Sequence, residues 1–164
     1  MTFLIVSDTH GRIERLERLF KMHKNVDALF FLGDGLRDLS WIDTRGVPVY
    51  SVRGNCDAMT FDAEDEIIVD LGGKRIFASH GHIYFVKSSY LAMAHRAALL
   101  GADIMLFGHT HTPLCTSVGA GESIGDFTLQ KRLHILNPGS LGYDGRFGNV
   151  VVRGGLILTS LGEL

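Results

Sequence analysis

Short apolar runs alternate with polar stretches in the first third of the chain, and they predict strands separated by helices. The runs at 3–6 and 28–32 predict two buried strands. Between them, residues 13–23 carry apolar side chains at helical spacing with charged residues opposite, which predicts an amphipathic helix. A short helix at 36–42 and a strand at 47–52 follow. This order is typical of βαβ units in a parallel sheet.

The pattern changes after this point, because Gly72-Gly73 separates two strand-like segments and predicts an antiparallel hairpin. Segment 119–132 has three glycines and mixed polarity, which predicts a mobile loop or a hairpin excursion. The other predicted elements are the hairpin strands at 66–71 and 74–79, a helix at 88–100 capped by Ser88 and ended by Gly101, and strands at 104–107, 114–118, 133–136, 149–153 and 156–160.

Composition limits the classes of protein that fit. The 164 residues with 46% hydrophobic content suit a single domain, 1–164, with a sizeable core. Every long apolar stretch is interrupted, so we expect no membrane span, and no basic segment precedes the first run, so we expect a cytoplasmic protein. Two cysteines outside any CxxC pattern predict neither a disulfide framework nor a zinc finger. A net charge of −2 argues against stable binding of duplex nucleic acid.

Metal-competent side chains follow five of the predicted strands, in the loops where those strands end. Singly, each has an ordinary explanation as a cap, a turn residue or a core histidine. In open α/β sheets, however, the loops at the carboxyl ends of strands converge on one crevice. We therefore expect one site lined by all of them together. The residues are Asp8, His10, Asp34, Asn55, His80, His109 and His111.

The number and type of these donors favour two divalent ions. Seven ligands exceed the three or four protein ligands of one zinc ion, but they suit two ions that share a carboxylate. Mixed imidazole and oxygen donors suit manganese, iron, zinc, nickel or cobalt, and they do not separate manganese, iron and zinc. Of these ions we expect manganese. Two such ions about 3.5–4 Å apart activate a hydroxide for in-line attack on a phosphate ester. Two divalent ions with two carboxylates and one hydroxide leave a single net positive charge, which a phosphodiester monoanion would neutralise.

The ordered motifs Asp8-Thr9-His10, Gly33-Asp34-Gly35, Gly54-Asn55-Cys56-Asp57, His80-Gly81-His82 and Gly108-His109-Thr110-His111 resemble those of the calcineurin-like metallophosphoesterases. The Gly-Asn-Cys-Asp spelling, with Asn137-Pro138-Gly139-Ser140 later, is similar to the small single-domain phosphodiesterases of the YfcE type. The resemblance implies a β-sandwich of mixed sheets flanked by helices, with the active site at the carboxyl ends of the strands.

The resemblance also implies how the ligands divide. One ion would be held by His10 and His111 with Asp8 and Asp34. The other would share Asp34 and take the remaining donors, which are Asn55, His80 and His109. A metal-bridging hydroxide would then attack phosphorus, with a small phosphodiester as substrate.

Three further residues are candidates for the phosphate side of the site or for supporting its ligands. Asp57 and His82 each stand two residues after a predicted ligand. Cys56 stands where larger members of the resembled family carry histidine. A thiol with a reference pKa near 8.5 is a poorer cationic clamp than imidazolium. We therefore expect modest activity that favours diesters over unactivated monoesters.

Two alternatives share the same fold. One is a non-catalytic metal-binding scaffold like the retromer subunit that resembles this family, and the other is a phosphomonoesterase. Intact donors at all seven positions favour an enzyme. Segment 119–132 is longer than the matching loop in this type, which leaves open a homo-oligomer or a different access for the substrate.

Overall fold

The computed structural model describes residues 1–57 and 62–164 and contains two five-stranded mixed sheets. Strand order is β12-β11-β1-β2-β3 in the first sheet and β4-β5-β6-β10-β7 in the second. The strands of the first sheet are β1 (Thr2–Val6), β2 (Ala28–Phe31), β3 (Val49–Ser51), β11 (Arg146–Arg153) and β12 (Leu156–Glu163). Those of the second are β4 (Glu66–Leu71), β5 (Lys74–Ser79), β6 (Ile104–Leu106), β7 (Leu114–Val118) and β10 (Leu133–Asn137).

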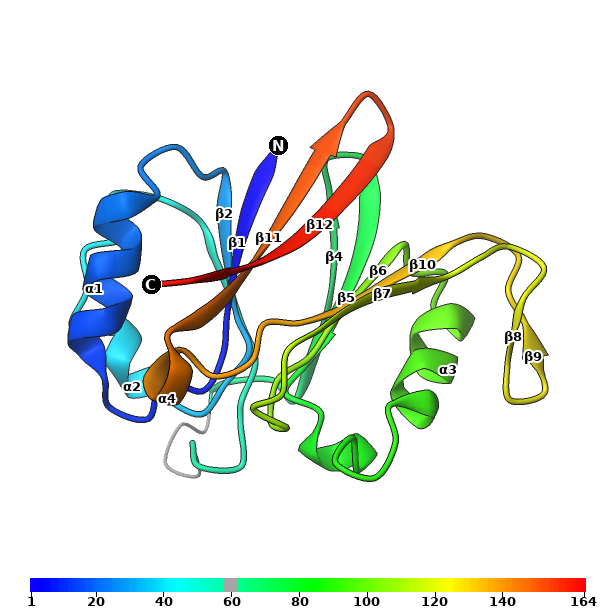
Figure 1. Ribbon diagram of the computed structural model, residues 1–164, viewed down its shortest axis with the longest axis horizontal. Helices are drawn as coiled ribbons and strands as arrows, with labels where there is room; N and C mark the ends of the chain where they lie inside the picture. Colours follow the sequence, from blue (N-terminus) through cyan, green and yellow to red (C-terminus); the bar gives the residue numbers. More distant parts are fainter. Residues whose placement is uncertain (58–61) are drawn as a thin grey trace.

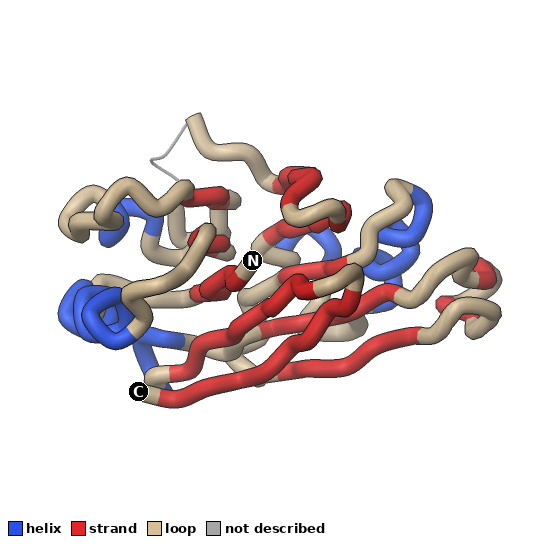
Figure 2. The backbone as a smooth tube through the Cα atoms, turned by 90° about the horizontal axis from the view of Figure 1, so that it is seen from above, coloured by secondary structure: helices blue, strands red, loops and turns tan. Residues whose placement is uncertain are grey.

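The helices lie outside the paired sheets (Figures 1 and 2). They are α1 (Ile13–Met22), α2 (Leu36–Leu39), α3 (Leu91–Leu99), α4 (Leu141–Asp144) and the 3₁₀ turn η1 (His82–Tyr84). In Figure 1, α1 and α3 stand on opposite sides of the strands. No helix among the residues described is long and apolar enough to cross a membrane.

Three apolar layers hold this arrangement together. The central layer joins both sheets and includes Phe3 and Phe30 from one and Ile76 and Leu136 from the other, all fully buried. A second layer packs α1 against the outer face of the first sheet, and a third packs α3 against the second sheet. Burial on both faces explains why the central strands are continuous apolar runs in the sequence. The predicted β-sandwich of mixed sheets flanked by helices is confirmed.

Each sheet has three adjacent parallel strands, which lie at one side of the first sheet and at the centre of the second. In the first sheet β1, β2 and β3 are parallel, and in the second β5, β6 and β10 are parallel. Antiparallel partners flank them: β11 pairs β1, β4 pairs β5, and β7 pairs β10. Because parallel strands end on the same side, their following loops gather at one edge, at the bottom of Figure 1.

Several elements differ from the sequence prediction. The expected cap at Ser88 is wrong, because the amides of Ser88 and Ser89 close a turn on the Phe85 carbonyl and α3 begins only at Leu91. The glycine stop at Gly101 is confirmed, with φ at +67°. Helix α4 was not predicted, and β11 and β12 extend beyond the predicted 149–153 and 156–160.

Segment 119–132 contains a small hairpin of β8 (Ser123–Ile124) and β9 (Phe127–Thr128), which confirms the hairpin alternative. Ile124 and Leu129 are buried in the layer that contains α3. The hairpin therefore packs beside α3, at the right of Figure 1.

A carboxylate on β4 ties this helical layer to the sheet. Glu66 accepts a hydrogen bond from the Arg96 guanidinium at 2.8 Å and another from the Tyr84 hydroxyl. Burial alone would raise the pKa of Glu66, but these two donors outweigh burial and hold it below its usual value. Burial and the same contact raise the pKa of Tyr84 to about 12.

We expect Glu66→Gln to lower the melting temperature at pH 7 by about 2–4 °C, since a partly exposed charged hydrogen bond contributes on the order of 1 kcal/mol. The folded carboxyl has the lower pKa, so its contribution is complete above the unfolded value of 4.5 and disappears as pH falls through the folded value. Calorimetry should show the difference shrinking below about pH 4. The exposed Glu64→Gln is the control, and a difference that persists at pH 3 would contradict the assignment.

Candidate metal centre

The loops that follow β1, β2, β3, β5 and β6 carry the seven predicted ligands. Hydrogen bonds between the loops fix their relative positions. The amide of Asp8 donates to the Gly33 carbonyl at 3.0 Å, and the amide of His10 donates to the Asp34 carbonyl at 3.1 Å. The Gly108 amide donates to the His80 carbonyl at 3.1 Å. The His109 amide donates to Asp8 Oδ2 at 3.1 Å, so loops from both sheets meet at one edge.

The backbone at this edge is held in an unusual conformation. Seven non-glycine residues among those described have positive φ, and five of them are predicted ligands. Such residues cost of order 1–3 kcal/mol each and cluster where function demands a particular side-chain direction. The five are Asp8 (+56°), His10 (+46°), Asp34 (+55°), His109 (+65°) and His111 (+57°).

Asp8, His10 and His111 form the first donor cluster. His111 Nε2 lies 3.1 Å from Asp8 Oδ1 and 3.2 Å from His10 Nε2, and His10 Nε2 lies 3.7 Å from the same carboxylate oxygen. The Asp8 side chain is fully buried. Its other oxygen accepts hydrogen bonds from Ser7 Oγ and from the His109 amide, so Oδ1 is directed at the two imidazoles.

Asp34, His80 and His109 form the second cluster. The ring of His80 is fully buried, and its Nδ1 lies 2.6 Å from the Leu32 carbonyl, which fixes Nδ1 as the protonated nitrogen. Its Nε2 then faces Asp34 Oδ2 at 3.5 Å and has no hydrogen-bond partner among the described residues. A lone pair facing a buried carboxylate is the arrangement that a bound cation satisfies.

The site's electrostatics follow from this packing. Burial would raise the pKa of Asp34, but His80 and the Cys56 amide stabilise its carboxylate and hold the pKa well below its usual range. Burial would lower the pKa of His80, while the carboxylates of Asp34 and Asp8 outweigh that effect and raise it. Burial and the neighbouring His80 lower the pKa of His109 to about 4, so its imidazole is neutral at pH 7, the form that binds metals.

Asn55 and Cys56 lie at the exposed mouth of the site, after β3. The Cys56 amide donates to Asp34 Oδ1 at 2.7 Å, and Asn55 Nδ2 donates to Cys56 Sγ at 3.3 Å. The thiol of Cys56 also forms a donor cluster with His10 and Asp34. Burial and the carboxylates around it, first that of Asp34, raise its pKa to about 11, so it is neutral at pH 7.

Close backbone approach explains the two glycines beside Asp34. A Cβ at Gly33 would lie 2.5 Å from the amide nitrogen of Gly54, and one at Gly54 would overlap the Asp34 carboxylate. The loops after β2 and β3 can therefore touch only because both positions lack a side chain.

Asp57 stabilises this contact between the loops after β2 and β3. Its carboxylate accepts backbone N–H groups from Asp34 at 2.7 Å, Gly54 at 2.9 Å, and Gly35 and Leu36 at 3.0 Å. The side chain is 6% exposed. This geometry gives Asp57 a positioning role on the Asp34 loop and directs both its oxygens at the backbone.

The structure brings His82 beside the second cluster, with its ring centroid 5.5 Å from that of His80 and 6.2 Å from that of His109. Its Nδ1 is buried without a hydrogen-bond partner among the described residues, and burial together with His80 lowers its pKa. His23, His95 and His134 belong to none of the donor clusters found in the described part of the chain.

Asn137 and Ser140, which the sequence offered only as part of a motif with no assigned role, brace the first and fifth loops. Asn137 Nδ2 donates to the Gly108 carbonyl at 2.9 Å and to Thr110 Oγ1 at 3.0 Å, and Ser140 Oγ donates to the Asp8 carbonyl at 2.9 Å. Ser140 also caps α4 by accepting the Tyr143 amide. The signal available for that cap was a serine directly after Pro138-Gly139.

Exposed aromatic rings beside the clusters were also missed. The Tyr143 ring centroid lies 5.2 Å from those of both His10 and His111, and the side chain is 62% exposed. On the other side, Trp41 lines a cavity of about 320 Å³ together with His10, Asp34 and Cys56.

The donor set suits divalent transition ions. Imidazole nitrogens and carboxylate oxygens form two groups, and the donor atoms of each group lie within 4.8 Å of one another. In the second group, His80 Nε2 is buried and has no hydrogen-bond partner in the described part of the chain. Imidazole with carboxylate is the combination typical of manganese, iron, zinc, nickel or cobalt sites. The residues therefore fit such ions on both sides of Asp34.

The family model described as the calcineurin-like phosphoesterase superfamily domain matches residues 1–153. The chain belongs to this superfamily. A relative, the probable metallophosphoesterase YsnB of Bacillus subtilis, is 36% identical over 145 residues, which cover 86% of this chain and 75% of YsnB. The phosphodiesterase YfcE of Escherichia coli K12 is 24% identical over 147 residues, covering 73% of this chain and 74% of YfcE. The expected resemblance to YfcE-type proteins is confirmed.

Solved structures of this calcineurin-like fold include Vps29. Vps29 of Entamoeba histolytica, in its zinc complex, superposes with a TM-score of 0.73 at 20% identity and covers 98% of each chain. At that identity the likeness shows the fold alone. The chain is thus a calcineurin-like metallophosphoesterase with candidate metal-ligand clusters.

Proposed function

We propose that the chain is a two-metal phosphodiesterase. The observation that carries this proposal is the pair of donor clusters around Asp34. The buried His80 Nε2 lies 3.5 Å from the Asp34 carboxylate and has no hydrogen-bond partner among the residues described. Asp8, His10, Asp34 and His111 would hold one ion, and Asp34, Asn55, His80 and His109 the other. Manganese is the proposed ion.

When bound, the two ions would activate water for in-line attack on phosphorus and neutralise the phosphate charge. The chain's own residues hold the site in shape. The Cys56 amide keeps one Asp34 oxygen in place, so the other remains directed at the histidines. Asp57 fixes the backbone of that loop. Neutral His109 offers its lone pair at pH 7.

The neutral thiol of Cys56 favours a diester over a monoester. A dianionic monoester places a second charge among three carboxylates, and a thiol with a pKa near 11 offers no positive charge to offset it. A diester monoanion has no such second charge. We therefore propose a small cytoplasmic phosphodiester as the substrate of a single domain, 1–164, acting alone or as a homo-oligomer.

The test uses purified protein stripped with a chelator and assayed with bis(4-nitrophenyl) phosphate. We expect no turnover after stripping, recovery with Mn²⁺, and at least about tenfold slower hydrolysis of 4-nitrophenyl phosphate. Metal uptake without turnover under Mn²⁺, Zn²⁺, Fe²⁺, Ni²⁺ or Co²⁺ would favour the scaffold alternative. Faster hydrolysis of the monoester would favour a phosphomonoesterase.

A further inference from the structure

The cavity that opens beside the donor clusters has a second wall with different chemistry. Its volume is about 320 Å³, and its inner wall contains His10, Asp34 and Cys56. The outer wall contains Arg37 of α2 and Trp41 of the turn that follows. A molecule with its phosphate at the donor clusters would extend over these two side chains.

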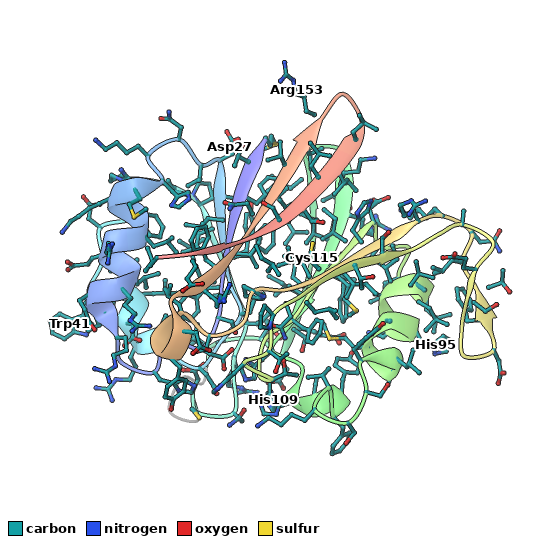
Figure 3. All side chains as sticks on the ribbon, viewed as in Figure 1. Asp27, Trp41, His95, His109, Cys115 and Arg153 are labelled. Atoms are coloured by element: carbon teal, nitrogen blue, oxygen red, sulfur yellow. The ribbon has the colours of Figure 1, made fainter. Side chains whose placement is uncertain are left out.

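Trp41 is exposed although its neighbours are packed. Leu39 and Ile42 pack against the layer around α1, whereas the Trp41 side chain remains 72% exposed. It is the only tryptophan in the chain. Figure 3 shows it on the outside of the fold, beside α2. A large planar ring left open at a cavity wall is suited to stacking on another planar ring.

Arg37 adds positive charge to the same wall. Within residues 1–57 and 62–164, its guanidinium makes no hydrogen bond or ion pair that would neutralise it. The acids that line the cavity hold other groups: Asp34 and Asp57 accept backbone amides, and Asp38 accepts Thr9 Oγ1 and the Gly11 amide. The arginine charge is therefore available to an anion.

The wall is also fixed relative to the donor clusters. Asp38 joins α2 to the loop after β1, and Asp57 holds the amides of Gly35 and Leu36 at the start of α2. A Cβ at Gly35 would overlap Thr9 Oγ1, so the approach of these two loops requires glycine. Such preorganisation lowers the cost of binding a ligand across the site.

We propose that Arg37 and Trp41 form an ester-arm subsite that selects phosphodiesters carrying a planar aromatic ring, such as a nucleobase. The inference rests on the proposed phosphodiesterase function and specifies its substrate class. Trp41 stacks on the ring, and Arg37 attracts the phosphate charge. Stacking on an aromatic side chain contributes about 1–3 kcal/mol per base, which corresponds to a roughly 5–150-fold change in affinity.

The kinetic test compares two diesters that release the same 4-nitrophenolate: thymidine 5′-(4-nitrophenyl) phosphate and methyl 4-nitrophenyl phosphate. We expect Trp41→Ala to raise KM for the thymidine diester at least about fivefold, with little change for the methyl diester, and Trp41→Phe to restore most of the difference. Arg37→Gln should raise KM for both. The controls are Leu158→Ala and Arg153→Gln on the β11–β12 hairpin. Figure 3 shows Arg153 at the opposite end of the molecule from His109. Equal effects of Trp41→Ala on both diesters would overturn the subsite and leave the phosphodiesterase proposal standing.

A binding test examines the subsite without relying on hydrolysis, so it can support the subsite even if the phosphodiesterase proposal fails. Fluorescence of the single tryptophan reports directly on Trp41. With Zn²⁺ present, which is d¹⁰ and not a paramagnetic quencher, thymidine 5′-monophosphate should change the emission saturably and ribose 5-phosphate should not. This result would support the subsite even if no diester were hydrolysed. Equal responses to both ligands, or none to the nucleotide, would overturn it.

Discussion

Asp34→Asn is expected to lower kcat/KM for bis(4-nitrophenyl) phosphate by at least about 100-fold. Residues that only orient a metal ligand already contribute about 10–100-fold, and Asp34 is proposed to contact both ions. The amide keeps an oxygen for the Cys56 N–H, which now donates to Asp34 Oδ1 at 2.7 Å. The Asp34 side chain is only 3% exposed, and burying a neutral amide costs less free energy than burying a charge, so we expect the variant to fold.

The matched control for this change is Asp126→Asn in the exposed turn of the β8–β9 hairpin. It removes the same charge far from the donor clusters and should leave turnover unchanged. Circular dichroism and the melting temperature establish that both variants fold. Turnover of folded Asp34→Asn within tenfold of the parent would contradict the two-metal mechanism.

Asp57→Asn should have the largest effect on stability, about 2–4 kcal/mol in the free energy of unfolding. The Asp57 carboxylate accepts four backbone amides, two on each oxygen. Replacing one oxygen by NH₂ turns two of these contacts into donors that face donors, and a hydrogen bond to a charged group contributes about 1.5–3 kcal/mol. Urea denaturation at pH 7 measures the loss.

The same variant distinguishes positioning from contact with substrate. Because Asp57 acts through the backbone of Asp34, we expect metal affinity to fall about 10–100-fold while excess Mn²⁺ restores much of kcat. Asp126→Asn again serves as the control. A stability change below 0.5 kcal/mol, with kcat lost at saturating Mn²⁺, would instead indicate direct action on the substrate.

The central strands were predictable because burial on both faces leaves continuous apolar runs. β1 and β2 could be predicted for that reason. The hairpin at Gly72-Gly73 could be predicted because two glycines favour a tight turn. The start of α3 was not predictable, because the Phe85 carbonyl accepts the amides of Ser88 and Ser89 and holds both serines in a turn before the helix begins at Leu91. Helix α4 has four residues, too few for periodicity to appear.

The sequence allowed the candidate donor residues to be predicted, but not how their side chains are oriented or which groups they contact. Residue type and position at strand ends brought together Asp8, His10 and the other candidates. The sequence does not indicate which ring nitrogen of His80 is available to a metal ion. It also does not indicate that both carboxylate oxygens of Asp57 accept backbone amides. Trp41 and Arg37 belong to a short helix and turn, and their place beside the cavity depends on tertiary contacts through Asp38.

The central claim is that these donor clusters hold two ions that share Asp34. Equilibrium dialysis of the stripped protein against Mn²⁺, followed by metal analysis, tests it most directly. We predict two ions per chain for the parent protein and at most one for Asp34→Asn at the same free concentration. Saturation of the parent at a single ion, or an unchanged stoichiometry in Asp34→Asn, would contradict the account.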